Sequence, residues 1–187
     1  ERDGAVMLRA VATDGHRLAS AEVPLPDGAK EMPGVIVPRK TVGELHKLVD
    51  EMTDDVAVGL SETKIRFTFD DAILTSKLID GTFPDYNRVI PEGNDKTMEV
   101  DTKLFADAVD RVSAISSEKS RAVKLKIIGD SLTLSSSGPD SSSATEELEV
   151  SYKGKDLEIG FNAGYLLDIT RQIEGPGTRL LLADAAS

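Results

Sequence analysis

The sequence contains 187 residues, 40% of them hydrophobic and 29% charged, which is enough apolar material for one large packed domain or two small ones. The longest apolar runs, such as 180–183, are much shorter than the roughly 20 residues that a membrane-spanning helix needs. The first residues are polar, carry no apolar signal-peptide core and do not begin with Met. We therefore expect a globular protein with no membrane partner, whose natural start lies upstream of Glu1.

Cysteine is absent, which excludes disulfides, catalytic thiols and thiolate metal sites and fits a cytoplasmic location. The two histidines, His16 and His46, are distant in sequence, so neither a metal site nor another cofactor is expected. The net charge of −11 argues against nucleic acid as a partner, because duplex binding requires Lys and Arg to neutralise phosphates. A charge acts over only about 8–10 Å, however, so a local basic surface is compatible with the acidic total.

Three segments, 35–49, 98–112 and 157–173, share a short alternating strand, a polar residue pair and an amphipathic helix. Taking Pro38, Asp101 and Asn162 as equivalent positions, the segments are spaced by 63 and 61 residues. Asp101 and Asn162 are predicted helix N-caps. The predicted third helix runs to Ile173, before the breakers at 175–177.

Hairpins are predicted after the first two helices, at 56–69 and 123–134, and each is followed by one more strand, at 72–79 and 146–152. The opening segment 5–23 has the pattern of a hairpin from an earlier copy, and 178–184 that of the first hairpin strand of a later one. The Ser-rich stretch 135–143 is predicted to be a solvated loop. The repeat is therefore β-α-β-β-β, and two copies per domain predict an α+β fold with two helices packed on antiparallel sheet.

Catalytic residues are few. Asp14 and His16 could act as acid and base in a hydrolase, but Asp14-Gly15 is also a common hairpin turn pair. The sequence contains no Gly-x-Ser-x-Gly elbow and no Gly-rich phosphate loop. We expect a turn at this position and a protein that is not an enzyme.

Two features suggest binding surfaces. Arg39 and Lys40 open the first predicted helix, where the macrodipole disfavours each cation by about 0.3–1 kcal/mol, which indicates either an external ligand or ordinary solvated surface. The segment 81–91, with Pro84 and aromatic neighbours, is predicted to be a stiff interdomain linker. Alternatively, its apolar residues and an exposed Leu18 line a groove for an extended peptide.

The stretches Ala12-Thr-Asp-Gly-His-Arg-Leu-Ala19, Val35-Ile-Val-Pro-Arg-Lys40, Ser76-Lys-Leu-Ile-Asp-Gly-Thr-Phe-Pro-Asp-Tyr86 and Ile159-Gly-Phe-Asn162 resemble the signature stretches of the bacterial DNA polymerase III beta subunit family, the replicative sliding clamps. The resemblance implies a DNA clamp fold and a head-to-tail homodimeric ring that encircles duplex DNA. It also implies that 1–86 is the later part of the middle domain and 87–187 the last domain, truncated at its C-terminal end. The implied function is that of a DNA replication processivity factor, and the alternative is a peptide-binding scaffold without a DNA role.

The resemblance also implies three sets of site residues. Polymerase subunits, the clamp loader and repair proteins would insert short linear motifs into a hydrophobic cleft formed by Thr13, Gly15, His16, Arg17, Leu18, Pro84, Arg88 and Val89. The residues that face DNA would be Arg39, Lys40 and Lys47. The subunit interface would use Ala114, Ile115, Glu146, Glu147 and Glu149.

Overall fold

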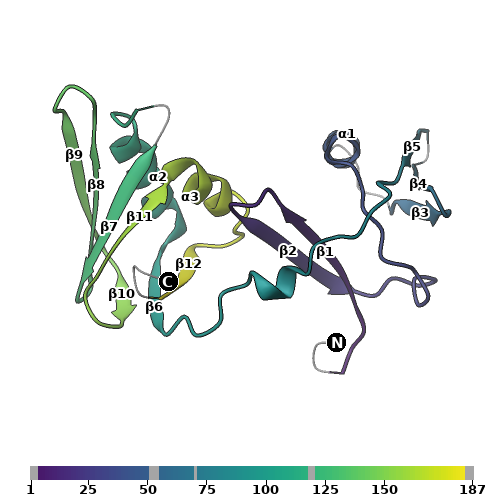
Figure 1. Ribbon diagram of the computed structural model, residues 1–187, viewed down its shortest axis with the longest axis horizontal. Helices are drawn as coiled ribbons and strands as arrows, with labels where there is room; N and C mark the ends of the chain where they lie inside the picture. The colour runs from purple at the N-terminus through teal and green to yellow at the C-terminus, as the bar shows by residue number, and fades with distance from the viewer. Residues whose placement is uncertain (1–3, 51–54, 70, 118–120, 184–187) are drawn as a thin grey trace. The chain divides into compact units, whose positions relative to one another are not determined.

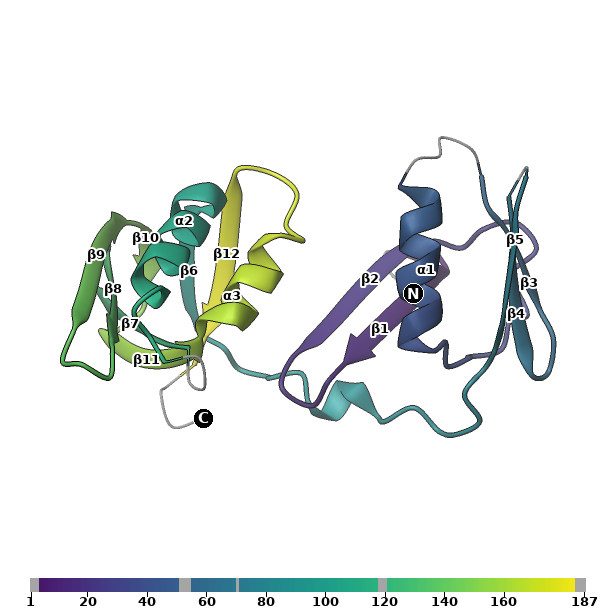
Figure 2. The same ribbon diagram turned by 90° about the horizontal axis from the view of Figure 1, so that it is seen from above.

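The computed structural model describes residues 4–50, 55–69, 71–117 and 121–183 (Figures 1 and 2). The chain divides into two compact units, Glu1–Asn87 and Arg88–Ser187. Within the described residues no helix is long and apolar enough to cross a membrane. Each unit combines helices with antiparallel sheets, which confirms the predicted α+β class.

The second unit forms two antiparallel sheets, ordered β11-β7-β8-β9 and β10-β6-β12. Two helices pack beside each other within it, as Figure 2 shows. Its elements are β6 (Lys96–Asp101), α2 (Thr102–Ser113), β7 (Ala122–Ile128), β8 (Ser131–Ser137), β9 (Ser143–Glu149), β10 (Ser151–Lys153), β11 (Leu157–Asn162), α3 (Ala163–Thr170) and β12 (Gly177–Leu182).

The core of this unit lies between α2 and the larger sheet. Alternate residues of β7 and β8 are fully buried, including Leu125 and Leu134, while their neighbours point to solvent. Phe105 and Val109 of α2 pack against this apolar face. Burial of a side chain of this size stabilises the fold by about 1.5–3 kcal/mol, so the helix is fixed to the sheet by its inner face.

Both predicted N-caps are confirmed. The Asp101 carboxylate accepts a hydrogen bond from the Leu104 N–H at 2.8 Å, and the Asn162 side chain accepts one from the Gly164 N–H at 2.8 Å. The predicted end of the third helix is wrong, because α3 stops at Thr170. Beyond it the Ile173 N–H bonds back only three residues, to the Thr170 carbonyl at 3.3 Å, so the last turn tightens before the glycines.

The predicted strand 146–152 is in fact two strands in different sheets. β9 pairs with β8, whereas β10 pairs with β6, and the break falls at the buried Val150. The predicted loop 135–143 is also shorter than expected, since β8 continues to Ser137 and β9 begins at Ser143. Ser136 keeps the inward alternation of β8, and its buried hydroxyl donates to the Ala122 carbonyl at 2.9 Å.

The first unit contains a two-stranded sheet, β1-β2, and a three-stranded sheet, β3-β4-β5. Ile65, Phe67 and Phe69 form its buried core, with Leu45 and Val49 of α1 packed against them. A short 3₁₀ helix, η1 (Tyr86–Arg88), crosses the boundary between the units. The other elements are β1 (Met7–Thr13), β2 (Leu18–Pro24), α1 (Arg39–Val49), β3 (Ala57–Leu60), β4 (Lys64–Thr68) and β5 (Ile73–Lys77).

The strand predicted at 35–37 does not form. The Ile36 carbonyl accepts one backbone hydrogen bond, from the Ile79 N–H at 2.9 Å. Pro33 and Pro38 flank the segment and have no N–H to extend a ladder, so it remains an extended connector. The complete β-α-β-β-β order is therefore found in the second unit, from β6 to β9, whereas the copy in the first unit starts directly at its helix.

The loop between β8 and β9 supports a stability prediction. A Cβ atom on Gly138 would lie 2.6 Å from the Ile115 carbonyl oxygen and would also overlap the Ser142 hydroxyl. We expect Gly138→Ala to lower the free energy of unfolding by about 1–3 kcal/mol, measured by urea denaturation. Gly160→Ala is the control, because a Cβ there meets open space, and an equal loss in both variants would contradict the prediction.

Candidate functional site

The turn between β1 and β2 is held by its own side chains. The Asp14 carboxylate accepts hydrogen bonds from the N–H groups of His16 and Arg17, each at 3.0 Å, and from the Arg17 guanidinium at 3.1 Å. The Thr13 hydroxyl donates to the Arg17 carbonyl at 2.8 Å. Gly15 has a φ of 85°, which suits glycine. The segment is thus a preformed turn, and this arrangement favours the turn interpretation of Asp14 over a catalytic one.

The electrostatics of the turn follow from these bonds. The N–H groups of His16 and Arg17 lower the pKa of the Asp14 carboxyl, because they stabilise its ionised form. Thr13, Gly15 and His16 are exposed. Leu18, which was predicted to be exposed, is half-buried at the start of β2, where it lies opposite Thr13. The turn therefore presents mainly polar groups, with one partly covered apolar side chain.

The segment that carries Pro84 is attached to the β1-β2 hairpin. Pro84 is exposed, whereas Phe83 and Tyr86 are half-buried and contact each other edge to face, with ring centroids 6.5 Å apart. The Arg9 guanidinium donates to the Tyr86 hydroxyl at 2.7 Å and also pairs with Glu22. The structure thus brings Pro84 and the predicted turn residues into one unit. Arg88 and Val89 are exposed residues of the other unit.

Sequence reasoning missed Arg9. The pairing of Arg9 with Glu22 can be predicted from the sequence, because a turn over 14–17 places these two residues opposite each other. The contact with Tyr86, 77 residues away, has no local signal in the sequence.

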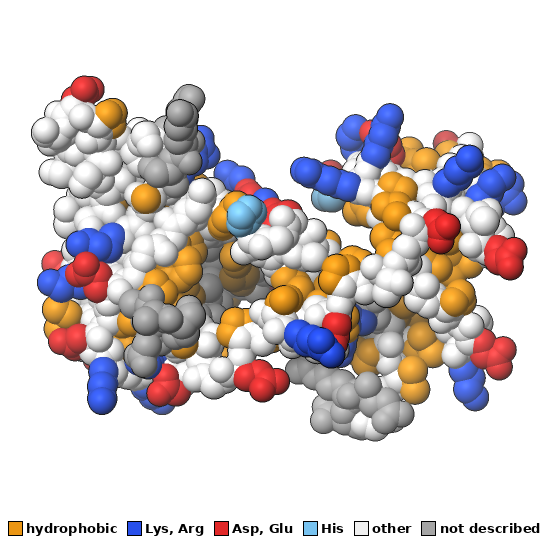
Figure 3. Space-filling view, in the orientation of Figure 1, with side chains coloured by type: hydrophobic (Ala, Val, Ile, Leu, Met, Phe, Trp, Pro, Cys, Tyr) orange, Lys and Arg blue, Asp and Glu red, His pale blue; other side chains and the backbone are white. Residues whose placement is uncertain are grey.

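The predicted DNA-facing residues lie on the exposed side of α1. Thr41 is buried on the opposite side, where its hydroxyl bonds to that of Ser76 at 2.7 Å. Lys47 pairs with Glu44 at 3.1 Å. The helix contains three Lys or Arg residues and one acidic residue, and Figure 3 shows Lys and Arg side chains gathered over it. α2 contains two basic and two acidic residues, so it has no excess of positive charge. The positive side chains that α1 exposes, Arg39, Lys40 and Lys47, form a local basic surface on an acidic chain.

A second group of exposed cations lies on the outer face of β4 and β5 and was not predicted. Lys64 is directly opposite Lys77 in the register, and Arg66 is opposite Thr75. In the part of the chain that the structure describes, none of the three cations makes an ion pair. Like charges directly opposite each other are unfavourable in a sheet, and the exposed setting of this pair limits that effect.

The predicted subunit-interface residues are divided by the alternation of β9. Glu146 faces α2. The Arg111 guanidinium donates two hydrogen bonds to the Glu146 carboxylate and thereby lowers the pKa of Glu146. Glu147 and Glu149 point to the other face, and the Glu147 carboxylate accepts from the Ser131 hydroxyl at 2.6 Å. Ala114 and Ile115 follow the end of α2, one exposed and one half-buried. Because β9 is the edge of its sheet, its outer backbone groups are available for pairing.

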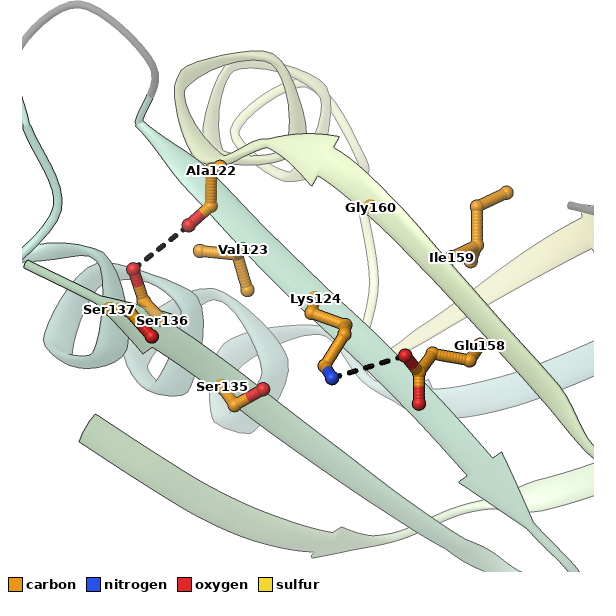
Figure 4. A pocket seen from close by; sticks show the side chains of 9 residues that line it. All are labelled: Ala122, Val123, Lys124, Ser135, Ser136, Ser137, Glu158, Ile159 and Gly160. Atoms are coloured by element: carbon orange, nitrogen blue, oxygen red, sulfur yellow. Dashed lines mark hydrogen bonds and ion pairs between the residues drawn. The ribbon is translucent and has the colours of Figure 1, made fainter. Parts of the chain in front are cut away.

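A shallow pocket lies on the outer face of the larger sheet of the second unit (Figure 4). Its volume is about 390 Å³, and small residues of β7, β8 and β11, such as Ser135 and Gly160, make the hollow. An ion pair between Lys124 and Glu158, at 3.1 Å, lies at its side. None of the predicted site residues lines it. Among the described residues, no group of three His, Cys, Asp or Glu residues could hold a metal ion.

Comparisons with known proteins give a consistent result. Residues 2–85 match the family described as the DNA polymerase III beta subunit, central domain, and residues 87–187 match the C-terminal domain of the same subunit. The beta sliding clamp of Caulobacter vibrioides is 54% identical over 184 residues, which cover 98% of this chain and 50% of that protein.

Solved structures agree. A sliding clamp from Bartonella birtlesii bound to griselimycin has a TM-score of 0.92 and 52% identity, covering 99% of this chain and 50% of that one. The pol III beta structure of Caulobacter crescentus has a TM-score of 0.93 and 53% identity, covering 100% of this chain and 50% of that one. The chain thus spans about half the length of these relatives, and it belongs to the DNA polymerase III beta subunit family.

Proposed function

We propose that this chain is part of a ring-shaped sliding clamp, a non-enzymatic processivity factor that encircles duplex DNA in the cytoplasm and tethers other proteins to it. The observation that carries the proposal is the match of nearly the whole chain to two successive domains of one family, supported by helix-on-sheet units in both. Residues 1–86 would belong to the middle domain of the clamp, and residues 87–187 to its last domain.

The DNA-facing surface would be the exposed side of α1, with Arg39, Lys40 and Lys47. A closed ring holds a duplex by encirclement, so strong phosphate contacts are unnecessary and would hinder sliding. A modest excess of positive charge on one helix, within a chain of net charge −11, fits this requirement. The acidic remainder would repel DNA from other surfaces.

The partner-binding cleft would use the β1-β2 turn, Leu18 and Pro84, which all belong to the first unit. The preformed turn supports this assignment, since a rigid surface loses little conformational entropy when a peptide binds. Polymerase subunits, the clamp loader and repair proteins would insert short linear motifs here. Because a relative is bound to griselimycin, we propose that this chain binds the same molecule through these residues.

The subunit contact would use the edge of β9 and the end of α2. An exposed edge strand can pair with a strand of a second subunit, and Glu147 and Glu149 add negative charge for a basic partner surface. Glu146 would contribute through its pair with Arg111. Full-length subunits would join head to tail into a homodimeric ring through this edge.

A peptide-binding scaffold without a DNA role is the second candidate. The net charge of −11 favours it, as does the pairing of Lys47 with Glu44, which offsets part of the positive charge of α1.

Encirclement predicts a topological dependence of DNA binding. The full-length clamp, once loaded, should remain on circular duplex DNA and slide off linear duplex DNA with open ends, because no chemical bond holds it. Gel filtration of labelled complexes measures the retained fraction. Equal retention on open linear DNA and on linear DNA with blocked ends would contradict encirclement.

Charge reversal tests the DNA-facing helix. The double variant Arg39→Glu and Lys40→Glu should lower the loading of the full-length clamp on DNA several-fold at low salt, because two cations beside the phosphates are replaced by two anions. The control is Lys64→Glu with Lys77→Glu, which makes the same charge change on the outer face of β4 and β5. Loading that is unchanged in the first variant, or equally reduced in both, would favour the scaffold alternative.

Truncation of apolar side chains tests the cleft. Leu18→Ala and Pro84→Ala should each weaken griselimycin binding by about 1–3 kcal/mol, as anchors at an interface do. Isothermal titration calorimetry measures the change. Ile73→Ala, which shortens a 59% exposed side chain on β5, should bind normally. Unaltered affinity in both cleft variants would remove these residues from the site.

A further inference from the structure

One guanidinium connects the β1-β2 hairpin to the segment that carries Pro84. Arg9 of β1 lies directly opposite Glu22 of β2 and pairs with its carboxylate. The same guanidinium donates to the Tyr86 hydroxyl at 2.7 Å, and the Arg9 Cζ atom lies 5.9 Å from the centroid of the Tyr86 ring. We call these three residues, Arg9, Glu22 and Tyr86, the Arg9 bridge.

The chemistry of the bridge requires arginine. A guanidinium offers donors in a planar fork, so it can bond a carboxylate on one side and a hydroxyl on another while stacking near an aromatic ring. Glu22 has only 22% of its side chain exposed, and it orients the fork toward Tyr86. A lysine would keep the charge and a single contact but could not span the same partners.

The Arg9 bridge is one of the contacts that hold the segment between β5 and β6. This segment is part of none of the described sheets, and two of its residues, Pro84 and Pro91, have no N–H to donate. The Phe83 ring packs against the edge of Tyr86 and extends the attachment toward Pro84. Tyr86 follows Pro84 by two residues, and Arg9 precedes the turn residue Thr13 by four on the same strand. The bridge therefore ties the two parts of the first unit that the proposed cleft uses.

We propose that Arg9 is a positioning residue of the peptide cleft, which holds Pro84 in place relative to the β1-β2 turn before a ligand binds. This inference rests on the proposed function, since it assumes that the turn and Pro84 form the binding surface. A segment that is ordered in advance loses less conformational entropy on binding, so affinity rises without any contact between Arg9 and the ligand.

The test uses griselimycin as the probe and the full chain as the protein. Arg9→Met removes all donors but keeps an aliphatic stem, and Tyr86→Phe removes only the hydroxyl and keeps the ring contact with Phe83. Arg9→Met should weaken griselimycin binding on the order of tenfold, Tyr86→Phe less, and the double variant should be no worse than Arg9→Met alone, because both changes break one linkage. Arg9→Lys should restore only part of the affinity.

A second readout separates positioning from general stability. Hydrogen exchange of the amides in 81–90, measured without ligand, should become faster in Arg9→Met, while the exchange of β7 and β8 stays unchanged. The matched control is Arg179→Met. Arg179 also pairs with a cross-strand glutamate, Glu99 at 2.8 Å, but among the described residues it contacts no aromatic ring. This variant should bind griselimycin normally.

The outcomes are distinct. Normal affinity and normal exchange in Arg9→Met, with griselimycin bound by the unsubstituted chain, would overturn the role of Arg9 and leave the proposed cleft intact. An equal loss of affinity in Arg179→Met would also overturn it, because the effect would then be one of net charge. Failure of the unsubstituted chain to bind griselimycin would overturn the cleft itself and the role of Arg9 with it.

Discussion

The packing of a helix on one face of an antiparallel sheet is the interaction on which the other features of the second unit depend. Phe105 and Val109 of α2 are completely covered by alternate residues of β7 and β8, such as Leu125 and Leu134. Because the inner faces of helix and sheet are used for this core, every polar partner must meet the outer side of a helix, the outer face of a sheet or an open strand edge. This unit thus provides three kinds of surface, and the proposed subunit contact uses one of them, the open edge of β9.

The effect of the chain's charge on a partner depends on how the charged side chains are distributed over the surface. The net value of −11 suggests a protein that avoids nucleic acid, yet α1 carries three cations against one acid. In 0.15 M salt a charge is felt over about 8 Å, so a phosphate near α1 would respond to Arg39 and Lys40 rather than to distant carboxylates. Weak, local attraction is what a ring needs in order to slide. The unfavourable position of these cations at a helix N-terminus is consistent with a role outside the fold itself.

Features set by neighbouring residues could be predicted from the sequence, and features set by distant partners could not. Asp101 and Asn162 were identifiable as caps because a cap bonds within its own first turn. The break at Val150 is set by the pairing of β10 with β6, which lies far away in the sequence. The strand expected at 35–37 is absent for a local reason, because Pro33 and Pro38 have no N–H to extend a ladder.

The candidate site shows the same division. Asp14 and Gly15 were correctly expected to form a turn, because the hydrogen bonds that close it lie within four residues. The attachment of Tyr86 to Arg9 is a long-range effect without a local pattern in the sequence. The family resemblance supplied site residues that composition and periodicity could not identify. It still gave no indication of Arg9, because that side chain lies outside the stretches that carry the resemblance.

The two halves of the proposed cleft in the first unit are therefore stabilised by different means. The turn is self-contained: its depressed Asp14 pKa means that the ionised carboxylate supports the turn at all pH values above the ordinary aspartate range, and this support is lost only as the pH falls through the depressed value. The Pro84 segment is held in part by the contact of the Tyr86 ring with Phe83 and in part by the Arg9 guanidinium of another strand. A binding surface of this construction has one part that is fixed by local chemistry and one that is adjustable from a distance. Substitutions at Arg9 or Tyr86 would tune affinity for a ligand while leaving the residues that touch it unchanged.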